Sequence, residues 1–196
     1  IGGAIKYVSK GLTTETKGSA QLTVGSYGQF DAKASIGGGN EMVRGRIALA
    51  SLNRDGFGRN LTLDEPVTNK DIFAIRGELG FFFNDNFDAQ IAFDSVSDDS
   101  KPRGAQMLAV NNFAPGLLVS PKTQPLSDRY DVRSGMPDVN GTEWQGWSLT
   151  LNYRATDDWT FKYILADRKS DTDTYIDFDT LPEQITDVKA FYNDEQ

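Results

Sequence analysis

The side chains best suited to bind a charged ligand are three arginines, Arg44, Arg46 and Arg76, which occur in two alternating segments of the chain. A guanidinium group keeps its charge at physiological pH and can donate paired hydrogen bonds to a carboxylate or a phosphate. The three arginines could therefore attract an anionic ligand. The plainer interpretation is that they pair with acidic side chains such as Glu78 or Asp31. The sequence favours ion pairing, with ligand binding as the alternative hypothesis.

Four aspartates near the end of the chain, Asp171, Asp173, Asp177 and Asp179, could supply the oxygen ligands that Ca²⁺ takes. The stretch does not follow an EF-hand loop, because it lacks glycine at the turn position and glutamate at the closing position. A solvated acidic loop is the preferred interpretation, so no metal site is predicted.

Catalytic residue types are scarce in the sequence. Histidine and cysteine are both absent from the 196 residues, which removes the commonest general base and every thiolate nucleophile. Asp94, Asp98 and Asp99 do not form a predicted catalytic pair, since nothing in the sequence fixes their separation. The sequence therefore predicts no catalytic residues, no enzyme and no bound cofactor. Because 28 acidic residues outnumber 20 basic ones, general nucleic-acid binding is not expected either.

The elements that must position these charges are segments in which apolar and polar residues alternate. Alternation places successive side chains on opposite faces of a strand, so each segment has one apolar and one polar face. The predicted fold is all-β, with about seven strands. They cover residues 20–24, 30–36, 43–49, 73–83, 87–93, 147–153 and 159–165.

The connections between these segments are of two kinds. Residues 37–42, 84–86 and 156–158 are predicted tight turns, whereas residues 54–71, 97–143 and 168–190 are long and polar. Apolar residues in the second long connection are expected to pack the loop, with a ligand pocket as the alternative; they are Met107, Phe113, Leu117, Leu118, Tyr130 and Met136.

Two architectures can produce such alternation: a transmembrane antiparallel β-barrel and a soluble β-sandwich. The barrel is favoured because several segments reach about ten residues, enough to cross a bilayer at a tilt. Short turns on one side and long loops on the other are typical of outer-membrane barrels. Aromatic residues near the predicted strand ends fit an interfacial girdle; they are Phe83, Phe87, Trp147, Tyr153 and Trp159.

The order of several short motifs resembles TonB-dependent outer-membrane receptors. Residues Ile1–Lys10, with their Gly-Gly pair, are similar to the end of that family's plug domain. Lys17–Gly28 resembles the first barrel strand and its hairpin, and Arg44–Ala50 followed by Arg54–Phe57 resembles the third strand and its loop. Thr156–Thr160 is similar to a periplasmic turn, and Asn193–Gln196 to the approach to a further strand.

This resemblance implies a domain organisation. Residues 1–12 would be the C-terminal tail of a plug domain, and residues 13–196 the N-terminal part of a 22-stranded, plugged barrel. The segment that couples to TonB and most of the plug would precede Ile1. Acidic plug residues would be further partners for the three arginines.

The resemblance also implies a function and a location, the bacterial outer membrane. Such receptors use TonB to import scarce nutrients, most often ferric siderophores, and otherwise cobalamin, haem or oligosaccharides. Outer-membrane lipid would surround the barrel, and Arg44, Arg46 and Arg76 could attract an anionic ferric complex. Two alternatives remain: a passive porin, and a soluble β-sandwich adhesin or carbohydrate-binding module.

Overall fold

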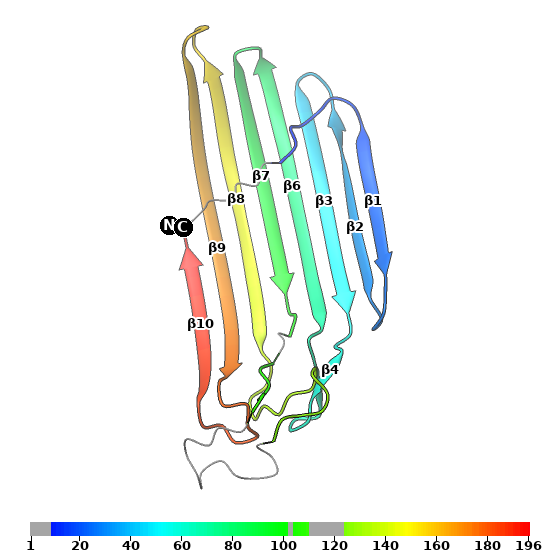
Figure 1. The fold of residues 1–196 in the computed structure, drawn as a ribbon. Helices are drawn as coiled ribbons and strands as arrows, with labels where there is room; N and C mark the ends of the chain where they lie inside the picture. Colours follow the sequence, from blue (N-terminus) through cyan, green and yellow to red (C-terminus); the bar gives the residue numbers. More distant parts are fainter. Residues whose placement is uncertain (1–8, 102–103, 110–123) are drawn as a thin grey trace.

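The computed structural model of the chain describes residues 9–101, 104–109 and 124–196. Eight strands form one antiparallel sheet in which each strand pairs with the next one along the chain (Figure 1). They are β1 (Lys17–Val24), β2 (Phe30–Gly39), β3 (Val43–Arg54), β6 (Lys70–Asn84), β7 (Phe87–Asp98), β8 (Asn140–Arg154), β9 (Thr160–Asp177) and β10 (Asp187–Glu195). The all-β prediction is confirmed. Among the described residues, no helix is long and apolar enough to cross a membrane.

The three predicted tight turns lie at one end of the sheet, and each is held by a side-chain oxygen. Asn40 Oδ1 accepts hydrogen bonds from the amides of Met42 and Val43, at 2.9 and 2.8 Å. Asn84 Oδ1 accepts a hydrogen bond from the Asn86 amide, and Thr156 Oγ1 accepts hydrogen bonds from the amides of Asp158 and Trp159. Asn and Thr favour turns because their side chains satisfy backbone donors about two residues further on. These turns separate β2 from β3, β6 from β7, and β8 from β9.

The long connections meet at the opposite end of the sheet, where β4 (Gly58–Asn60) and β5 (Glu65–Val67) form a separate hairpin (Figure 1). The buried apolar residues of the described chain also lie here; they are Val67, Val132, Met136 and Leu181. Asn60 is buried with them and donates to the backbone carbonyl of Ser134 at 3.0 Å. The loops thus have a small core of their own.

Of the apolar residues predicted to pack the 97–143 connection, Tyr130 and Met136 do so. Met107 is half-buried and lines a small hollow together with Leu126 and Thr180. Met136 is 4 per cent exposed, and the Tyr130 ring contacts Phe57 edge-on with 5.0 Å between centroids. Phe113, Leu117 and Leu118 lie outside the described residues.

The predicted long loop over residues 168–190 is wrong. β9 continues to Asp177 and β10 begins at Asp187, so only residues 178–186 connect the two strands. The sheet therefore has eight strands, not about seven. Beyond Leu165, β9 carries polar side chains on both faces, so the alternation that reveals the other strands is missing. Backbone pairing to β8 and β10 nevertheless continues over this stretch.

The eight strands make a single layer, because each one contacts only its hydrogen-bonded neighbours. A β-sandwich needs two sheets packed face to face. The described residues contain no such second sheet, since the only other sheet is the two-stranded β4–β5 hairpin. Neither face of the large sheet, one apolar and one polar, is covered by a second sheet in the described part of the chain.

Candidate functional site

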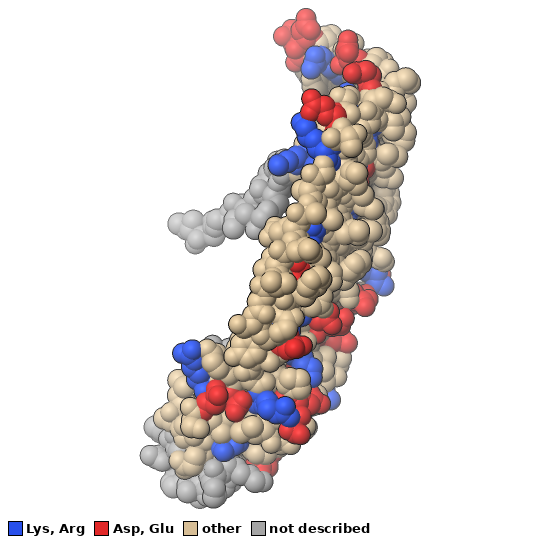
Figure 2. All heavy atoms as spheres, turned by 90° about the vertical axis from the view of Figure 1, so that its right-hand side faces the viewer, with Lys and Arg blue, Asp and Glu red and all other residues tan. Residues whose placement is uncertain are grey.

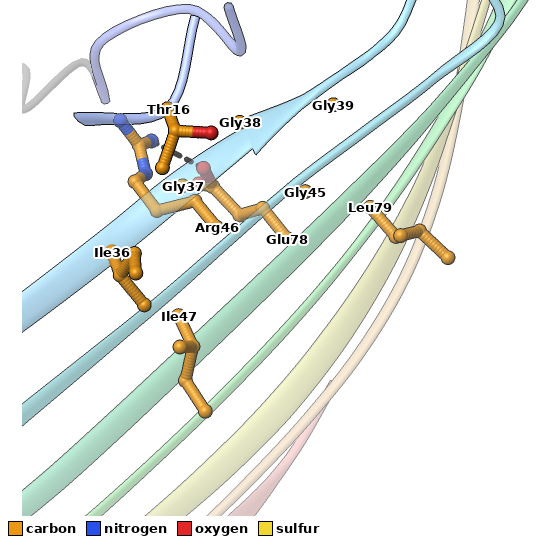
Figure 3. A pocket seen from close by; sticks show the side chains of 10 residues that line it. All are labelled: Thr16, Ile36, Gly37, Gly38, Gly39, Gly45, Arg46, Ile47, Glu78 and Leu79. Atoms are coloured by element: carbon orange, nitrogen blue, oxygen red, sulfur yellow. Dashed lines mark hydrogen bonds and ion pairs between the residues drawn. The ribbon is translucent and has the colours of Figure 1, made fainter. Parts of the chain in front are cut away.

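A chain of ion pairs crosses the polar face of the sheet. Glu78 on β6 pairs with Arg46 on β3 and with Arg76 at 2.7 Å. Arg76 also pairs with Asp94 on β7 at 3.1 Å. Figure 3 shows the Arg46 and Glu78 side chains on the side of Thr16, while Ile47 points the opposite way. Two of the three predicted arginines are thus joined through Glu78, as the ion-pairing interpretation expects.

Arg44 is not part of this chain of ion pairs. Its guanidinium carbon lies 3.9 Å from the centre of the Phe82 ring, and its Nε donates to the backbone carbonyl of Asn40 at 3.3 Å. Asp31, the other acidic partner expected from the sequence, pairs with Lys70 at 2.8 Å and not with an arginine. The predicted set therefore divides into Arg46 and Arg76, at the middle of the sheet, and Arg44, beside a tight turn.

A hollow of about 580 Å³ lies on the polar face beside Arg76. Its lining includes three small side chains from neighbouring strands, Ala48, Ala50 and Ala74. The strand register explains the hollow. Ala50 lies opposite Ala74, and Ala48 lies opposite Arg76, so small residues sit side by side where longer ones would fill the space. Charged and aromatic side chains surround these alanines.

Three residues of this region were not singled out as site residues from the sequence. Lys33 and Trp144 line the hollow with Asp94. Arg168 lies over the Trp144 ring, with 4.9 Å from its guanidinium carbon to the ring centre, and is 4.0 Å from Asp94. One signal could have revealed Trp144: it is a large aromatic residue at a position of β8 where the alternation places polar side chains.

The charges around the hollow do not cancel. Among its lining residues, Lys33 and Arg76 contribute two positive charges, against one negative charge from Asp94. Arg46, Glu78 and Arg168 pair with these residues or with each other but do not line the hollow. Lys33 makes no ion pair within the described part of the chain. A positively charged hollow with an aromatic wall can bind an anionic ligand that has a planar or apolar part.

The segment before β1 lies over the polar face near the tight turns (Figure 1). A Cβ atom on Gly80 of β6 would come within 2.8 Å of Leu12 Cδ1, so Leu12 covers this glycine. The Thr14 carbonyl accepts a hydrogen bond from the Gly39 amide at 3.2 Å. The Gly-Gly motif over residues 1–8, which carries part of the family resemblance, lies outside the described residues.

The other face carries a band of exposed apolar side chains. Val24, Phe83 and Tyr163 expose 76, 56 and 58 per cent of their surface, respectively. A hollow of about 480 Å³ near the tight turns is lined by residues of both faces (Figure 3). Ile36, Ile47 and Leu79 belong to the apolar face, whereas Thr16, Arg46 and Glu78 lie on the polar side. Seen from the β1 edge, charged side chains gather toward the two ends of the molecule and leave a mostly uncharged middle (Figure 2).

Aromatic rings form a belt on the apolar face beside the tight turns. Phe83 stacks on Phe87 with 5.2 Å between centroids, and Phe87 contacts Tyr153 edge-on at 6.4 Å. Trp159 stacks on Phe161 at 6.3 Å, and Phe161 lies opposite Tyr153 in the strand register. Trp147 is separate from this belt, because it lies opposite Asp167 where the apolar stretch of β9 has ended.

The apolar band crosses the strands obliquely. Toward the long loops, the band in β3 ends at Leu49. Following the paired residues from strand to strand across the sheet, Leu49 leads to Lys169 in β9. In β9 the band already ends at Leu165, four residues before Lys169. Four strand-to-strand steps separate β3 from β9, so the band shifts by about one residue per strand. With about 3.4 Å of rise per residue and about 4.8 Å between strands, this shift corresponds to a strand tilt of about 35°.

Comparison with known proteins gives no match: no family model matches the chain, and no curated protein or solved structure is significantly similar to it.

Proposed function

We propose that the chain is part of a transmembrane antiparallel β-barrel in the bacterial outer membrane, with its apolar face toward lipid and its polar face toward the lumen. The observation that carries this proposal is a single-layer sheet with one uncovered apolar face. Water-exposed apolar surface is costly at about 25 cal/mol per Å². A soluble sheet would cover such a face with a second layer, whereas a membrane barrel turns it toward hydrocarbon.

Three features of the apolar face support the membrane assignment. Its band implies a strand tilt of about 35°, within the range of about 35–45° found in outer-membrane barrels. The aromatic belt at Phe83, Phe87 and Tyr153 would lie at the periplasmic interface, beside the short turns. The long connections, with their own small core, would face the cell exterior. In a closed barrel, β1 and β10 would each pair with a further strand, which leaves no open edge in the lipid.

Within this architecture we favour a TonB-dependent receptor over a passive porin. The segment with Leu12 and Thr14 lies over the lumen face beside the periplasmic turns, where a plug domain would join the first barrel strand. A porin has no need of such a segment. The receptor would bind its cargo from outside and release it inward when TonB acts on the plug. No bond of the cargo is broken, so the protein would be a transporter and not an enzyme.

The cargo best matched by the lumen face is anionic, and among the cargoes of the family a ferric siderophore fits this charge. Lys33 and Arg76 line the hollow, with Trp144 as its aromatic wall, and Arg168 lies over the Trp144 ring. Arg46 would act through Glu78, which it shares with Arg76. Arg44, which lies against Phe82, would contribute only long-range attraction.

The test uses the full-length protein purified in detergent, with bound iron and small molecules measured by mass spectrometry. The membrane proposal expects sedimentation without detergent, and it would be overturned by a folded protein that stays soluble in buffer. The cargo proposal is tested separately. Ferric siderophores are titrated into wild type and into Lys33→Gln, and binding is followed as quenching of tryptophan fluorescence.

We expect Lys33→Gln to weaken binding about three- to tenfold, since it removes one charge that no described residue neutralises. Lys162→Gln is the matched control, because Lys162 lies on the same face near the tight-turn end, opposite Asn152. Equal weakening by both variants would indicate nonspecific attraction and would refute the hollow as the binding site.

A further inference from the structure

One row of paired residues on the polar face places an arginine on either side of an aspartate. From β6 to β9 the row consists of Arg76, Asp94, Gly146 and Arg168. Arg76 pairs with Asp94 from the neighbouring strand at 3.1 Å. Arg168 approaches the same carboxylate from two strands away, and its nearest nitrogen lies 4.0 Å from Oδ2. The side chain of Arg168 therefore extends across the whole width of β8.

Gly146 of β8 leaves the path of this side chain open. A Cβ atom on Gly146 would lie 3.4 Å from Nε of Arg168, so the arginine side chain lies over the glycine. Gly146 is accordingly buried, although no second sheet covers the polar face in the described part of the chain. A larger residue at this position would fill the space that Arg168 occupies.

Trp144, two residues before Gly146 on β8, is the second group that Arg168 contacts. The guanidinium carbon lies 4.9 Å from the centre of the indole ring. Directly opposite Trp144 are Val96 and Ser170, so no aromatic or charged side chain stands beside the ring in its own row. Arg168 reaches the ring on the diagonal, a distance that long side chains can span. Tryptophan is the ring that attracts a guanidinium group most strongly.

Asp94 keeps the guanidinium group of Arg168 over β8. Its Oδ1 pairs with Arg76, whereas its Oδ2 exposes less than 1 Å² and accepts no hydrogen bond. A buried carboxylate oxygen without a donor is costly, and a nearby positive charge reduces that cost. Arg168 supplies this charge, although 56 per cent of its side chain is exposed and could turn toward solvent. The buried oxygen and the indole ring thus hold one arginine between them.

Both groups that hold Arg168 belong to the hollow on the polar face. Trp144 and Asp94 line it, whereas Arg168 does not and contacts these two lining residues from outside. We propose that Arg168 is a positioning residue, which fixes the Trp144 ring as a wall of the hollow and so makes the hollow prefer anions that carry a flat aromatic group. This inference rests on the proposed function, because it names the feature of the cargo that the same hollow would select.

The first test follows the Trp144 ring without any ligand. The full-length protein is labelled with 5-fluorotryptophan, and the fluorine resonance that disappears in Trp144→Phe is assigned to Trp144. Arg168→Gln should shift and broaden this resonance, because the ring loses its cation. Arg168→Lys should largely restore it, since an ammonium group can also lie over the ring near Asp94. Lys162→Gln, on the same strand and face, is the matched control and should leave the resonance unchanged.

The second test measures selectivity with two dianions of equal charge and similar size. Phthalate is flat and aromatic, whereas cis-cyclohexane-1,2-dicarboxylate is neither, and both are titrated while the Trp144 resonance is recorded. We expect wild type to bind phthalate about three- to tenfold more tightly, as one aromatic contact would give. Arg168→Gln should lose this preference, and Arg168→Lys and Lys162→Gln should keep it. The loss of one positive charge weakens both dianions alike, so the ratio of their affinities reports the ring.

The remaining fluorotryptophan resonances show whether each variant is folded as wild type is. An unchanged Trp144 resonance in folded Arg168→Gln would overturn the positioning role. Equal affinity of wild type for the two dianions, or the same preference in wild type and Arg168→Gln, would overturn the selectivity. Failure of the cargo proposal looks different: the protein would not bind ferric siderophores, while the Trp144 resonance would still depend on Arg168.

Discussion

Introducing arginine at two adjacent positions of β8 tests which face of the sheet meets lipid. Leu149 lies between Ile91 and Leu165 on the apolar face. Thr150, the next residue, lies between Gln90 and Ile164 on the polar face. Because neighbouring residues of a strand point to opposite faces, the two substitutions differ in little except environment. Leu149→Arg should place a charge in hydrocarbon, and Thr150→Arg should place it in the lumen.

The expected free-energy cost of each arginine substitution depends on how deep the residue lies within the apolar band. At a tilt of about 35°, each residue advances by about 2.8 Å along the membrane normal. Leu149 then lies about 6 Å from Trp147, at one limit of the band in β8, and about 11 Å from Tyr153, at the other limit. Arginine costs about 2–4 kcal/mol near the bilayer midplane and about 0–1 kcal/mol near an interface. We expect Leu149→Arg to cost about 2–4 kcal/mol and Thr150→Arg less than about 1 kcal/mol.

The assay is denaturant unfolding of the full-length protein in phospholipid vesicles, followed by tryptophan fluorescence. Gln145→Arg provides a second control, because Gln145 lies on the same face as Leu149 but beyond Trp147, opposite Lys169. It should cost about 0–1 kcal/mol. Equal costs for Leu149→Arg and Thr150→Arg would refute the assignment of faces. Equal costs for Leu149→Arg and Gln145→Arg would refute the position of the band.

Three further substitutions test contacts within the sheet and its turns, each measured as a change in the free energy of unfolding. Glu78→Gln should cost on the order of 2–3 kcal/mol, since it removes the negative charge that Arg46 and Arg76 share on a partly buried face; a change below about 0.5 kcal/mol would mean that water already satisfies both arginines. Phe87→Ala should cost about 1–3 kcal/mol through its two ring contacts, and Phe87→Tyr should cost little, because the ring is kept. Asn40→Ala should cost about 1 kcal/mol because two turn amides lose their acceptor, whereas Asn40→Asp keeps that acceptor; similar losses in both variants would point to the backbone instead.

The sequence by itself determined the strands and turns whose signals are local. Alternation marks a strand wherever one face is apolar, as in β6 from Phe73 to Phe83, because the side-chain period of a strand is two residues. The tight turns are equally local, since an Asn or Thr side chain bonds amides about two residues away. The outer half of β9 and all of β10 escaped prediction, because their polar residues lie on both faces.

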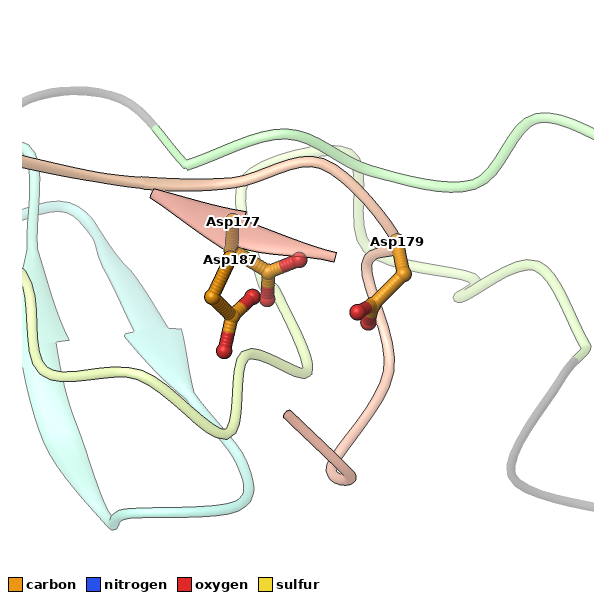
Figure 4. A group of neighbouring side chains, drawn as sticks. All are labelled: Asp177, Asp179 and Asp187. Carbon is orange, nitrogen blue, oxygen red and sulfur yellow. The ribbon is translucent and has the colours of Figure 1, made fainter. Parts of the chain in front are cut away.

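Only the tertiary structure decided which side chains meet across the strands. Glu78 joins Arg46 to Arg76 because β3 and β6 pair in one register, and a shift by one residue would move each side chain to the other face. The β3–β6 pairing also places Ala50 beside Ala74 in the hollow. The β9–β10 pairing places Asp187 opposite Asp177 at the loop end of the sheet (Figure 4). Residues this far apart in the chain carry no mutual signal in local periodicity. The pairing of backbone hydrogen bonds brings them together, and that pairing depends on the whole sheet.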